Sequence, residues 1–266
     1  INSTVDTLKH YIDEAAARID KELEFAREIQ LSALPSVYPP YPERKDIDLF
    51  AAMYTAKEVG GDFYDHFFIG HDKMVLVIAD VSGKGIPASL FMMKSKTLIK
   101  SLAETRTLTP SQIFDGANSE LCNGNDAQMF VTAWIGIYDI KAGTLTCSNA
   151  GHEYPAIRHK DGSFEFVRDK HGFVLAAMES SRYREYELPL APGDTIFVYT
   201  DGVTEATNTQ NELFSEDRLL KALNEVPDPG AETIITHVKQ RIDEFAGDAA
   251  QFDDRTMLCL KVNETQ

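Results

Sequence analysis

The sequence predicts an α+β fold in which two antiparallel β-sheets are flanked by α-helices, behind a long N-terminal helix. Segments rich in β-branched and aromatic residues recur from Ile47 to Val262. Helical segments occur between them in pairs rather than singly. Strict alternation of strands and helices would indicate a parallel sheet, whereas hairpins and paired helices favour antiparallel sheets with helices packed outside.

The first thirty-odd residues have a helical pattern of their own. Apolar residues step by three and four, as in a heptad repeat, at Val5, Leu8, Ile12, Ala15 and Ile19, and continue after a stutter at Leu23, Ala26 and Ile29. Prolines from Pro35 onward cannot continue a helix. We therefore predict a helical linker over residues 1–35 and a globular domain over residues 45–264. The seam must be buried on its own domain or on another chain, and we favour a dimerising coiled coil.

The elements of the domain follow from composition and punctuation. Seven strands are predicted at Ile47–Tyr54, Met74–Val81, Phe130–Ile140, Thr144–Ser148, Arg184–Leu190, Asp194–Tyr199 and Thr256–Val262. A hairpin is predicted around Asp161-Gly162. Four helices are predicted at Pro87–Glu104, Ser111–Leu121, Glu216–Asn224 and Ala231–Phe245.

Composition narrows the class of protein. The chain has 266 residues, of which 43% are hydrophobic and 26% charged, as in ordinary globular proteins. No apolar run is long enough to insert into a membrane. The formal net charge of −16 argues against nucleic acid as a partner. Three cysteines without metal-ligand spacing indicate a reducing cytoplasm, with Cys147 and Cys259 buried. Because the chain begins with Ile, we expect an upstream sensor or receiver domain to be missing.

Four aspartate-bearing stretches lie where an apolar strand meets a turn. They are Gly60-Gly61-Asp62, Ala79-Asp80-Val81, Thr200-Asp201-Gly202 and Asp253-Asp254. An ionised Asp at a buried strand end is costly unless it is paired or bound to a cation. Taken singly, each stretch could be a simple turn. Together, they could supply the oxygen ligands that Mg²⁺ and Mn²⁺ prefer. Gly83-Lys84-Gly85 lacks the spacing of a phosphate-binding P-loop.

A family resemblance joins these stretches. The motifs G-G-D-F-Y-D, A-D-V-S-G-K-G-I-P-A-S-L, N-A-G-H-x-x-P, Y-T-D-G-V-T-E-A and D-D-R-T resemble the SpoIIE/RsbU branch of the metal-dependent protein phosphatases, the type 2C superfamily. They occur in the family's order between about Val59 and Leu260. The segment from Ala26 to Pro35 also resembles the helical linker that precedes such domains.

The resemblance implies a site with two Mn²⁺ or Mg²⁺ ions. Asp80 would bridge the ions and the Val81 carbonyl would help to hold one of them. Asp62 would bind directly or through water, and Asp201 and Asp253 would hold the other ion. Asp254, the neighbouring residue, could instead orient a ligand or water. Hydrolysis would use an activated water without a phosphoenzyme, with Asp62, Asp80 and Asp201 as catalytic residues.

The sequence departs from the wider superfamily at several positions. Ser82 stands where type 2C enzymes have a histidine proposed as general acid. Lys57 is a candidate to replace their phosphate-binding arginine, or else a surface lysine. We interpret His152 as a turn histidine bonded to backbone. In Gly172–Ala176, alanine stands where relatives usually have glycine. The Ile86–Glu104 face formed by Leu90, Phe91, Lys94, Leu98 and Leu102 is interpreted as core packing or as a regulatory surface.

The resemblance implies a phosphoserine or phosphothreonine protein phosphatase. Its substrate would be a phosphorylated anti-anti-sigma factor with a STAS-type fold, in bacterial partner switching, with activity regulated through the N-terminal helix. Two alternatives stay open: a non-catalytic signalling module of the same fold, and another two-metal hydrolase such as a phosphodiesterase. The complete carboxylate set argues against the first. The shortage of histidine motifs argues against the second.

Overall fold

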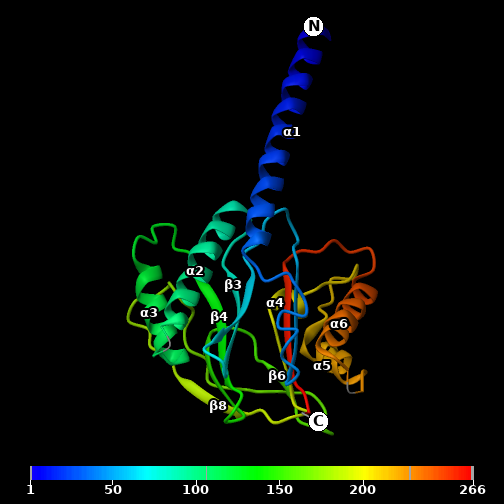
Figure 1. The fold of residues 1–266 in the computed structure, drawn as a ribbon. Coiled ribbons are helices and arrows are strands. Elements are labelled where there is room, and N and C mark those ends of the chain that lie inside the picture. The colour runs from blue at the N-terminus through cyan, green and yellow to red at the C-terminus, as the bar shows by residue number, and fades with distance from the viewer. Residues whose placement is uncertain (1, 106, 228, 265–266) are drawn as a thin grey trace.

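Two five-stranded sheets lie face to face between two layers of helices (Figure 1). The computed structural model describes residues 2–105, 107–227 and 229–264. Every strand pairing in both sheets is antiparallel. The predicted α+β sandwich is therefore confirmed, and so is the long N-terminal helix.

The two sheets draw their strands from different parts of the chain. Sheet A contains, in spatial order, β1 (Ile47–Tyr54), β10 (Arg255–Val262), β9 (Thr195–Tyr199), β6 (Ala156–Arg158) and β7 (Glu165–Phe166). Sheet B contains β2 (Phe63–Ile69), β3 (Lys73–Val81), β4 (Val131–Asp139), β5 (Thr144–Ala150) and β8 (Glu185–Pro189). The predicted hairpin around Asp161 is formed by β6 and β7. Sheet A thus pairs the first strand of the domain with its last strand.

Helices cover the outer face of each sheet. On sheet B lie α2 (Ile86–Glu104) and α3 (Pro110–Cys122), which also pack on each other. On sheet A, α6 (Ala231–Ala246) packs against β1 and β10, and α5 (Ser215–Asn224) packs against α6. The short α4 (Asp201–Thr204) follows β9 directly. A capping box between Thr109 and Gln112 begins α3.

The sequence did not predict one strand and predicted the buried face of one helix only in part. Strand β2 was not predicted, because its first residues follow the Gly60-Gly61-Asp62 turn and because Asp65 and His66 interrupt its apolar residues although both are buried. The α2 face interpreted as core packing or as a regulatory surface is buried only in part, with Phe91, Leu98 and Leu102 packed against the core. Its member Leu90 is 66% exposed, whereas the buried face carries Ala88, Met92, Lys96, Ile99 and Ala103. Part of the predicted face packs on α3 instead, where Leu102 contacts Gly116.

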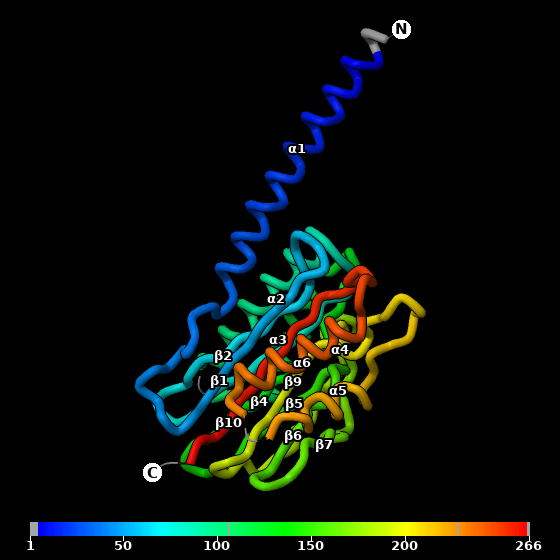
Figure 2. Tube along the Cα trace, turned by 90° about the vertical axis from the view of Figure 1, so that its right-hand side faces the viewer, coloured from blue at the N-terminus to red at the C-terminus, as the bar shows by residue number. Residues whose placement is uncertain are grey.

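The N-terminal helix α1 (Asn2–Ser32) projects away from the sandwich (Figures 1 and 2). Its apolar seam is exposed, with Val5 46%, Leu8 62%, Ile12 59% and Ile19 54% accessible. Packing of the seam against the chain's own domain, one of the two sequence-based alternatives, is therefore wrong. The helix reaches the domain only through its last turn, beyond which Leu34 enters the core.

The core has two parts. The larger joins the facing sides of the two sheets to α2 and α3, and it includes Trp134 and Met74. The smaller lies between sheet A and α5 and α6. Cys147 and Cys259 are buried free thiols, as predicted. No helix in the described part of the chain has the length and apolar character needed to cross a membrane.

Candidate metal centre

Four strand ends bring their aspartates to one end of the sandwich. Asp80 is the penultimate residue of β3 and Asp62 precedes β2, both in sheet B. In sheet A, Asp201 comes shortly after β9, and Asp253 shortly before β10. Antiparallel pairing of β2 with β3 and of β9 with β10 puts these ends side by side. The two sheets therefore contribute equally to one carboxylate cluster.

Asp62 is the most deeply placed member of the cluster, at 2% exposure. Its Oδ2 accepts hydrogen bonds from the hydroxyls of Thr200 at 2.7 Å and Thr256 at 2.6 Å. Burial raises the pKa of Asp62 well above its usual value, and the charges of Asp80 and Asp254 raise it further. The two threonines oppose this rise because hydrogen bonds favour the charged carboxylate. They also fix which oxygen of Asp62 faces sheet A.

Asp80 and Asp201 repel each other. Burial and the charge of Asp201 raise the pKa of Asp80 to about 7. Burial and the charge of Glu205 raise the pKa of Asp201 to about 6, with a further contribution from Asp253. Like-charged carboxylates that share a site behave in this way until a cation neutralises them.

Asp253 and Asp254 have different surroundings. Asp253 Oδ2 accepts a hydrogen bond from Lys84 Nζ at 2.7 Å, and its charge raises the pKa of both Asp80 and Asp201. Asp254 instead binds backbone, with Oδ1 accepting from the N–H of Ala56 at 2.8 Å and Oδ2 from that of Gly61 at 3.0 Å. Both charges act on the cluster, since that of Asp254 raises the pKa of Asp62 and Asp80, but both carboxylate oxygens of Asp254 also hold the loop that leads to Asp62.

Glycines allow this loop to pack so closely. A Cβ on Gly60 would lie 2.0 Å from Asp254 Oδ2, and one on Gly61 would lie 2.7 Å from the Val81 carbonyl oxygen. A Cβ on Gly202 would lie 1.9 Å from the Asp254 carbonyl oxygen. A side chain at Gly61 or Gly202 would meet backbone and force the strand ends apart, whereas one at Gly60 would displace the Asp254 carboxylate. The Gly-Gly-Asp and Asp-Gly motifs are therefore needed to bring the carboxylates together.

The structure also shows the surroundings of the residues that were discussed above in comparison with the type 2C superfamily. Ser82 Oγ accepts a hydrogen bond from the N–H of Phe130 at 2.9 Å, so it serves the backbone. Lys57 is exposed beside the cluster. His152 is buried in the turn after β5, where its Nδ1 pairs with the hydroxyl of Thr132 at 2.9 Å and its N–H donates to Asn149 Oδ1 at 2.8 Å. Ala176 has φ 69°, a left-handed conformation that favours glycine.

The donor set fits hard divalent cations. It consists of carboxylate and carbonyl oxygens, which Mg²⁺ and Mn²⁺ prefer over softer ligands. Among the described residues, no three His, Cys, Asp or Glu side chains are placed closely enough to hold an ion as they stand. Lys84 and the two threonines take up carboxylate oxygens instead. The cluster therefore has the right chemistry, with one oxygen of Asp62 and one of Asp253 accepting hydrogen bonds from protein donors.

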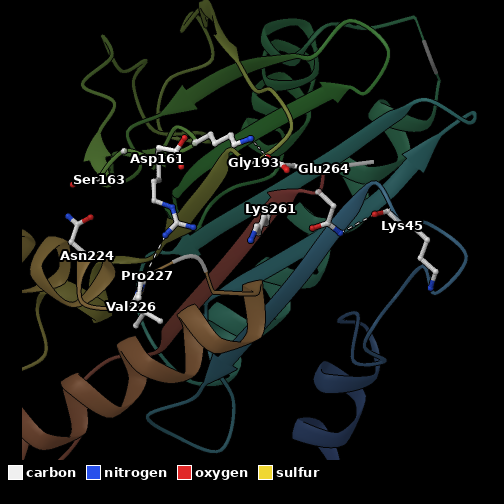
Figure 3. A pocket seen from close by; sticks show the side chains of 13 residues that line it. Lys45, Asp161, Ser163, Gly193, Asn224, Val226, Pro227, Lys261 and Glu264 are labelled. Carbon is white, nitrogen blue, oxygen red and sulfur yellow. Dashed lines mark hydrogen bonds and ion pairs between the residues drawn. The ribbon is translucent and has the colours of Figure 1, made fainter. Parts of the chain in front are cut away.

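A large pocket lies away from the carboxylate cluster. It occupies about 1110 Å³ at the opposite end of sheet A, where Lys261 and Gly193 line it (Figure 3). Lys160 pairs there with Glu264, and Arg158 donates to the Val226 carbonyl. A narrow pocket of about 10 Å³ lies instead between Asp80, Asp253 and the Gly60-Gly61 loop. This small pocket is the one next to the carboxylate chemistry.

Comparison with known sequences decides the family. Residues 70–263 match the family described as Stage II sporulation protein E (SpoIIE). The chain belongs to the SpoIIE family. It is 31% identical over 245 residues to the phosphoserine phosphatase RsbU of Bacillus subtilis, covering 91% of this chain and 70% of RsbU. It is 29% identical to the protein IcfG of Synechocystis, of which it spans only 42%.

Solved structures show the same fold. The SiaA-PP2C domain of Pseudomonas aeruginosa superposes with a TM-score of 0.81, at 22% identity, over 93% of this chain and 98% of that domain. The aligned 93% of this chain is more than the sandwich alone, residues 45–264, would make up, so the alignment also includes part of the segment before it. At this identity the likeness establishes the fold, while the family assignment rests on the sequence matches.

Sequence reasoning found the aspartates but missed their partners. Thr200 and Thr256 belong to the Y-T-D-G and D-D-R-T motifs, but no role was predicted for them. Lys84 was considered only for a phosphate loop, and Gln30 only as part of the linker resemblance. Their positions inside those motifs were the available signal. Their contacts depend on pairing across the sheet and between the helix and the domain, which spacing along the chain does not reveal.

Proposed function

We propose that this chain is a metal-dependent protein serine/threonine phosphatase. The observation that carries the proposal is the convergence of Asp62, Asp80, Asp201 and Asp253 from four strand ends of two sheets, in a member of the SpoIIE family. A purely structural role does not explain why burial and mutual repulsion are tolerated at this one place. Such clusters are costly and are typical of functional sites.

Two Mn²⁺ or Mg²⁺ ions are the proposed cofactors. The catalytic domain of the phosphatase PstP, a structural neighbour at a TM-score of 0.57 and 14% identity, was solved with two manganese ions. Here Asp80, Asp201 and Asp253 would hold the ions, with Asp62 and the Val81 carbonyl completing the set. Bound ions would supply positive charge to the phosphoryl group and activate water for in-line attack.

The chain's own residues would perform the supporting tasks. Thr200 and Thr256 orient Asp62 by donating to one of its oxygens. Asp254 fixes the Ala56–Gly61 loop and so acts as a positioning residue rather than a direct ligand. Ser82 Oγ accepts the Phe130 N–H, and we assign this hydroxyl no role in proton transfer. Protonation of the leaving group is left to water in the cluster.

The proposed substrate is a phosphorylated protein of the anti-anti-sigma, STAS-fold class in bacterial partner switching. Support comes from the relationship to RsbU, a phosphoserine phosphatase, and from the likeness to a structure of the RsbU and RsbW domains of Rv1364c of Mycobacterium tuberculosis, with a TM-score of 0.70. An open site suits a protein substrate, since Asp201 and Asp253 are only partly buried.

The division into a linker, residues 1–35, and a phosphatase domain, residues 45–264, is part of the proposal. The exposed seam of α1 would pair with a second copy of the chain and would carry signals from an upstream sensor or receiver domain. An exposed apolar face of this length is the expected feature of an interaction surface.

A substrate comparison tests the proposed activity. Phosphoserine-bearing STAS proteins, p-nitrophenyl phosphate and a cyclic dinucleotide should be offered with and without Mn²⁺. The same assay should be run on the full chain and on a chain lacking residues 1–35. Mn²⁺-dependent release of phosphate from the phosphoprotein supports the proposal. Turnover of the cyclic dinucleotide alone would indicate a phosphodiesterase, and no turnover of any substrate would favour a signalling module.

A further inference from the structure

The ammonium group of Lys84 lies at the edge of the carboxylate cluster. Its Nζ donates to Asp253 Oδ2 at 2.7 Å and to the Phe252 carbonyl oxygen at 2.7 Å. It also lies 3.7 Å from the centre of the Phe252 ring. The charge of Lys84 partly offsets the rise in the pKa of Asp201. One lysine therefore contacts one proposed cation ligand and acts electrostatically on a second.

The loop around Lys84 is built for this contact. Lys84 lies between the end of β3 and the start of α2, and is flanked by Gly83 with φ 87° and Gly85 with φ 76°. Left-handed backbone on both sides favours glycine and sets the direction in which the lysine leaves the chain. The side chains of Lys84 and Asp253 are 30% and 34% exposed. The pair is thus partly removed from water. Charges in such a partly buried place interact more strongly than charges on an open surface.

The two oxygens of Asp253 have different partners. Oδ1 accepts the N–H of Asp254 at 2.9 Å, a contact within the turn itself. Oδ2 accepts only the Lys84 ammonium in the part of the chain that the structure describes. An ion that uses Asp253 would therefore compete with Lys84 for Oδ2.

We propose that Lys84 is the counter-ion of the cation-free cluster, and that a divalent cation must displace it from Asp253 in order to bind there. The proposal rests on the proposed function, because it assumes that Asp253 is a cation ligand. Lys84 would stabilise the empty cluster by neutralising part of its repulsion. The same positive charge would lower the affinity for a cation, since both charges would lie close to Asp253.

An ordinary structural ion pair makes the opposite prediction. If Lys84 only holds Asp253 in a ligating orientation, its removal weakens cation binding. If Lys84 competes for Asp253, its removal strengthens cation binding while the cation-free protein becomes less stable. The sign of the change in affinity therefore separates the two roles.

Calorimetric titration with Mn²⁺ alone provides the test. The variants are Lys84→Met, which removes the charge, and Lys84→Arg, which retains it. Lys141→Met is the matched control, because Lys141 pairs with Asp72 at 2.8 Å at the other end of β3. We expect Lys84→Met to bind Mn²⁺ about tenfold more tightly than the native chain. Lys84→Arg should stay within about threefold of it and Lys141→Met within about twofold.

Each result has a distinct meaning. Mn²⁺ binding by the native chain with equal or weaker binding by Lys84→Met would overturn the role of Lys84. No Mn²⁺ binding by the native chain would overturn the proposed function itself. Thermal unfolding provides a second readout. Lys84→Met and Lys84→Gln should unfold at lower temperature than the native chain without Mn²⁺ and show a larger rise on its addition. An equal rise in all chains would also contradict the proposal.

Discussion

The side chain of Gln30 makes two hydrogen bonds with the backbone of Gly60. Its Nε2 donates to the Gly60 carbonyl at 2.7 Å, and its Oε1 accepts the Gly60 N–H at 3.0 Å. Gln30 is 3% exposed, whereas the residues before it on α1 are mostly exposed. Gly61, the residue after Gly60, donates its N–H to Asp254 Oδ2 at 3.0 Å. The last turn of the projecting helix is thus joined directly to the loop that carries Asp62.

Replacing Gln30 with methionine should loosen this loop. The variant keeps most of the side-chain volume but removes both hydrogen bonds, and leaves a buried N–H and C=O without their partner. We expect the free energy of unfolding to fall by about 1–3 kcal/mol and the Mn²⁺ concentration needed for half-maximal activity to rise severalfold. Chemical denaturation and Mn²⁺-dependent phosphatase assays measure the two effects. Glu28→Met, on the exposed part of the same turn, should change neither quantity. Equal behaviour of both variants would contradict the coupling.

The exposed seam of α1 predicts self-association. Leu8→Asp places a charge on the apolar seam of the helix, where a dimer would bury it. Ala17→Asp makes the same kind of change five residues after Ile12, on the opposite face of the helix. Sedimentation equilibrium should show a dimer for the native chain and for Ala17→Asp. It should show a monomer for Leu8→Asp. A native chain that stays monomeric at high concentration would remove the case for a coiled coil.

The threonine pair predicts weaker cation binding when its hydroxyls are removed. Thr200→Val and Thr256→Val keep the shape of the side chain but withdraw a hydrogen bond from Asp62, whose oxygen is buried. Each variant should lose about 1–3 kcal/mol of stability and bind Mn²⁺ several times more weakly. Thr200→Ser should restore most of the Mn²⁺ affinity because it restores the donor. Unchanged Mn²⁺ titrations of both valine variants would show that Asp62 needs no orientation.

Asp80 predicts a pH-dependent stability of the metal-free protein. Its pKa is about 7 in the folded chain, against about 3.9 when unfolded. The folded state binds this proton more tightly, so the stabilisation is fully present below about pH 4 and is lost as the pH rises through 7. Asp80→Asn removes the repulsion and should raise stability at pH 8 by on the order of 1–2 kcal/mol. Urea unfolding at pH 5 and pH 8 measures this effect. Asp13→Asn, on the exposed helix, should have no effect. A destabilised Asp80→Asn variant would contradict the account.

Much of the fold could be predicted because its strands alternate with clear punctuation. Ile47–Tyr54 was located at its observed bounds, and the hairpin around Asp161 followed from its Asp-Gly turn. Strand β2 was missed because it follows a glycine turn without a break. The α2 face was predicted only in part, because the helix is covered on two sides, by sheet B and by α3. The periodicity of apolar residues alone does not show which of two apolar helix faces is the more deeply buried.

The site was predicted less completely than the fold. The Asp-bearing motifs identified the carboxylates, because strand ends followed by glycine are visible in sequence. The difference between Asp253 and Asp254 required the contacts of each oxygen, since adjacent aspartates look the same in sequence. Gln30 lies thirty residues before Gly60 and acts through backbone atoms. Such contacts leave no spacing signal.

The central claim is that the carboxylate cluster hydrolyses phosphoproteins with the help of bound cations. The most direct measurement is phosphate release from p-nitrophenyl phosphate and from a phosphoserine-bearing STAS protein, by the native chain and by Asp80→Asn and Asp201→Asn, across a range of Mn²⁺ concentrations. We predict Mn²⁺-dependent turnover by the native chain and a loss of at least about a hundredfold in each variant, with circular dichroism spectra unchanged. Full activity in either variant, or native activity that is independent of added and bound metal, would contradict the account.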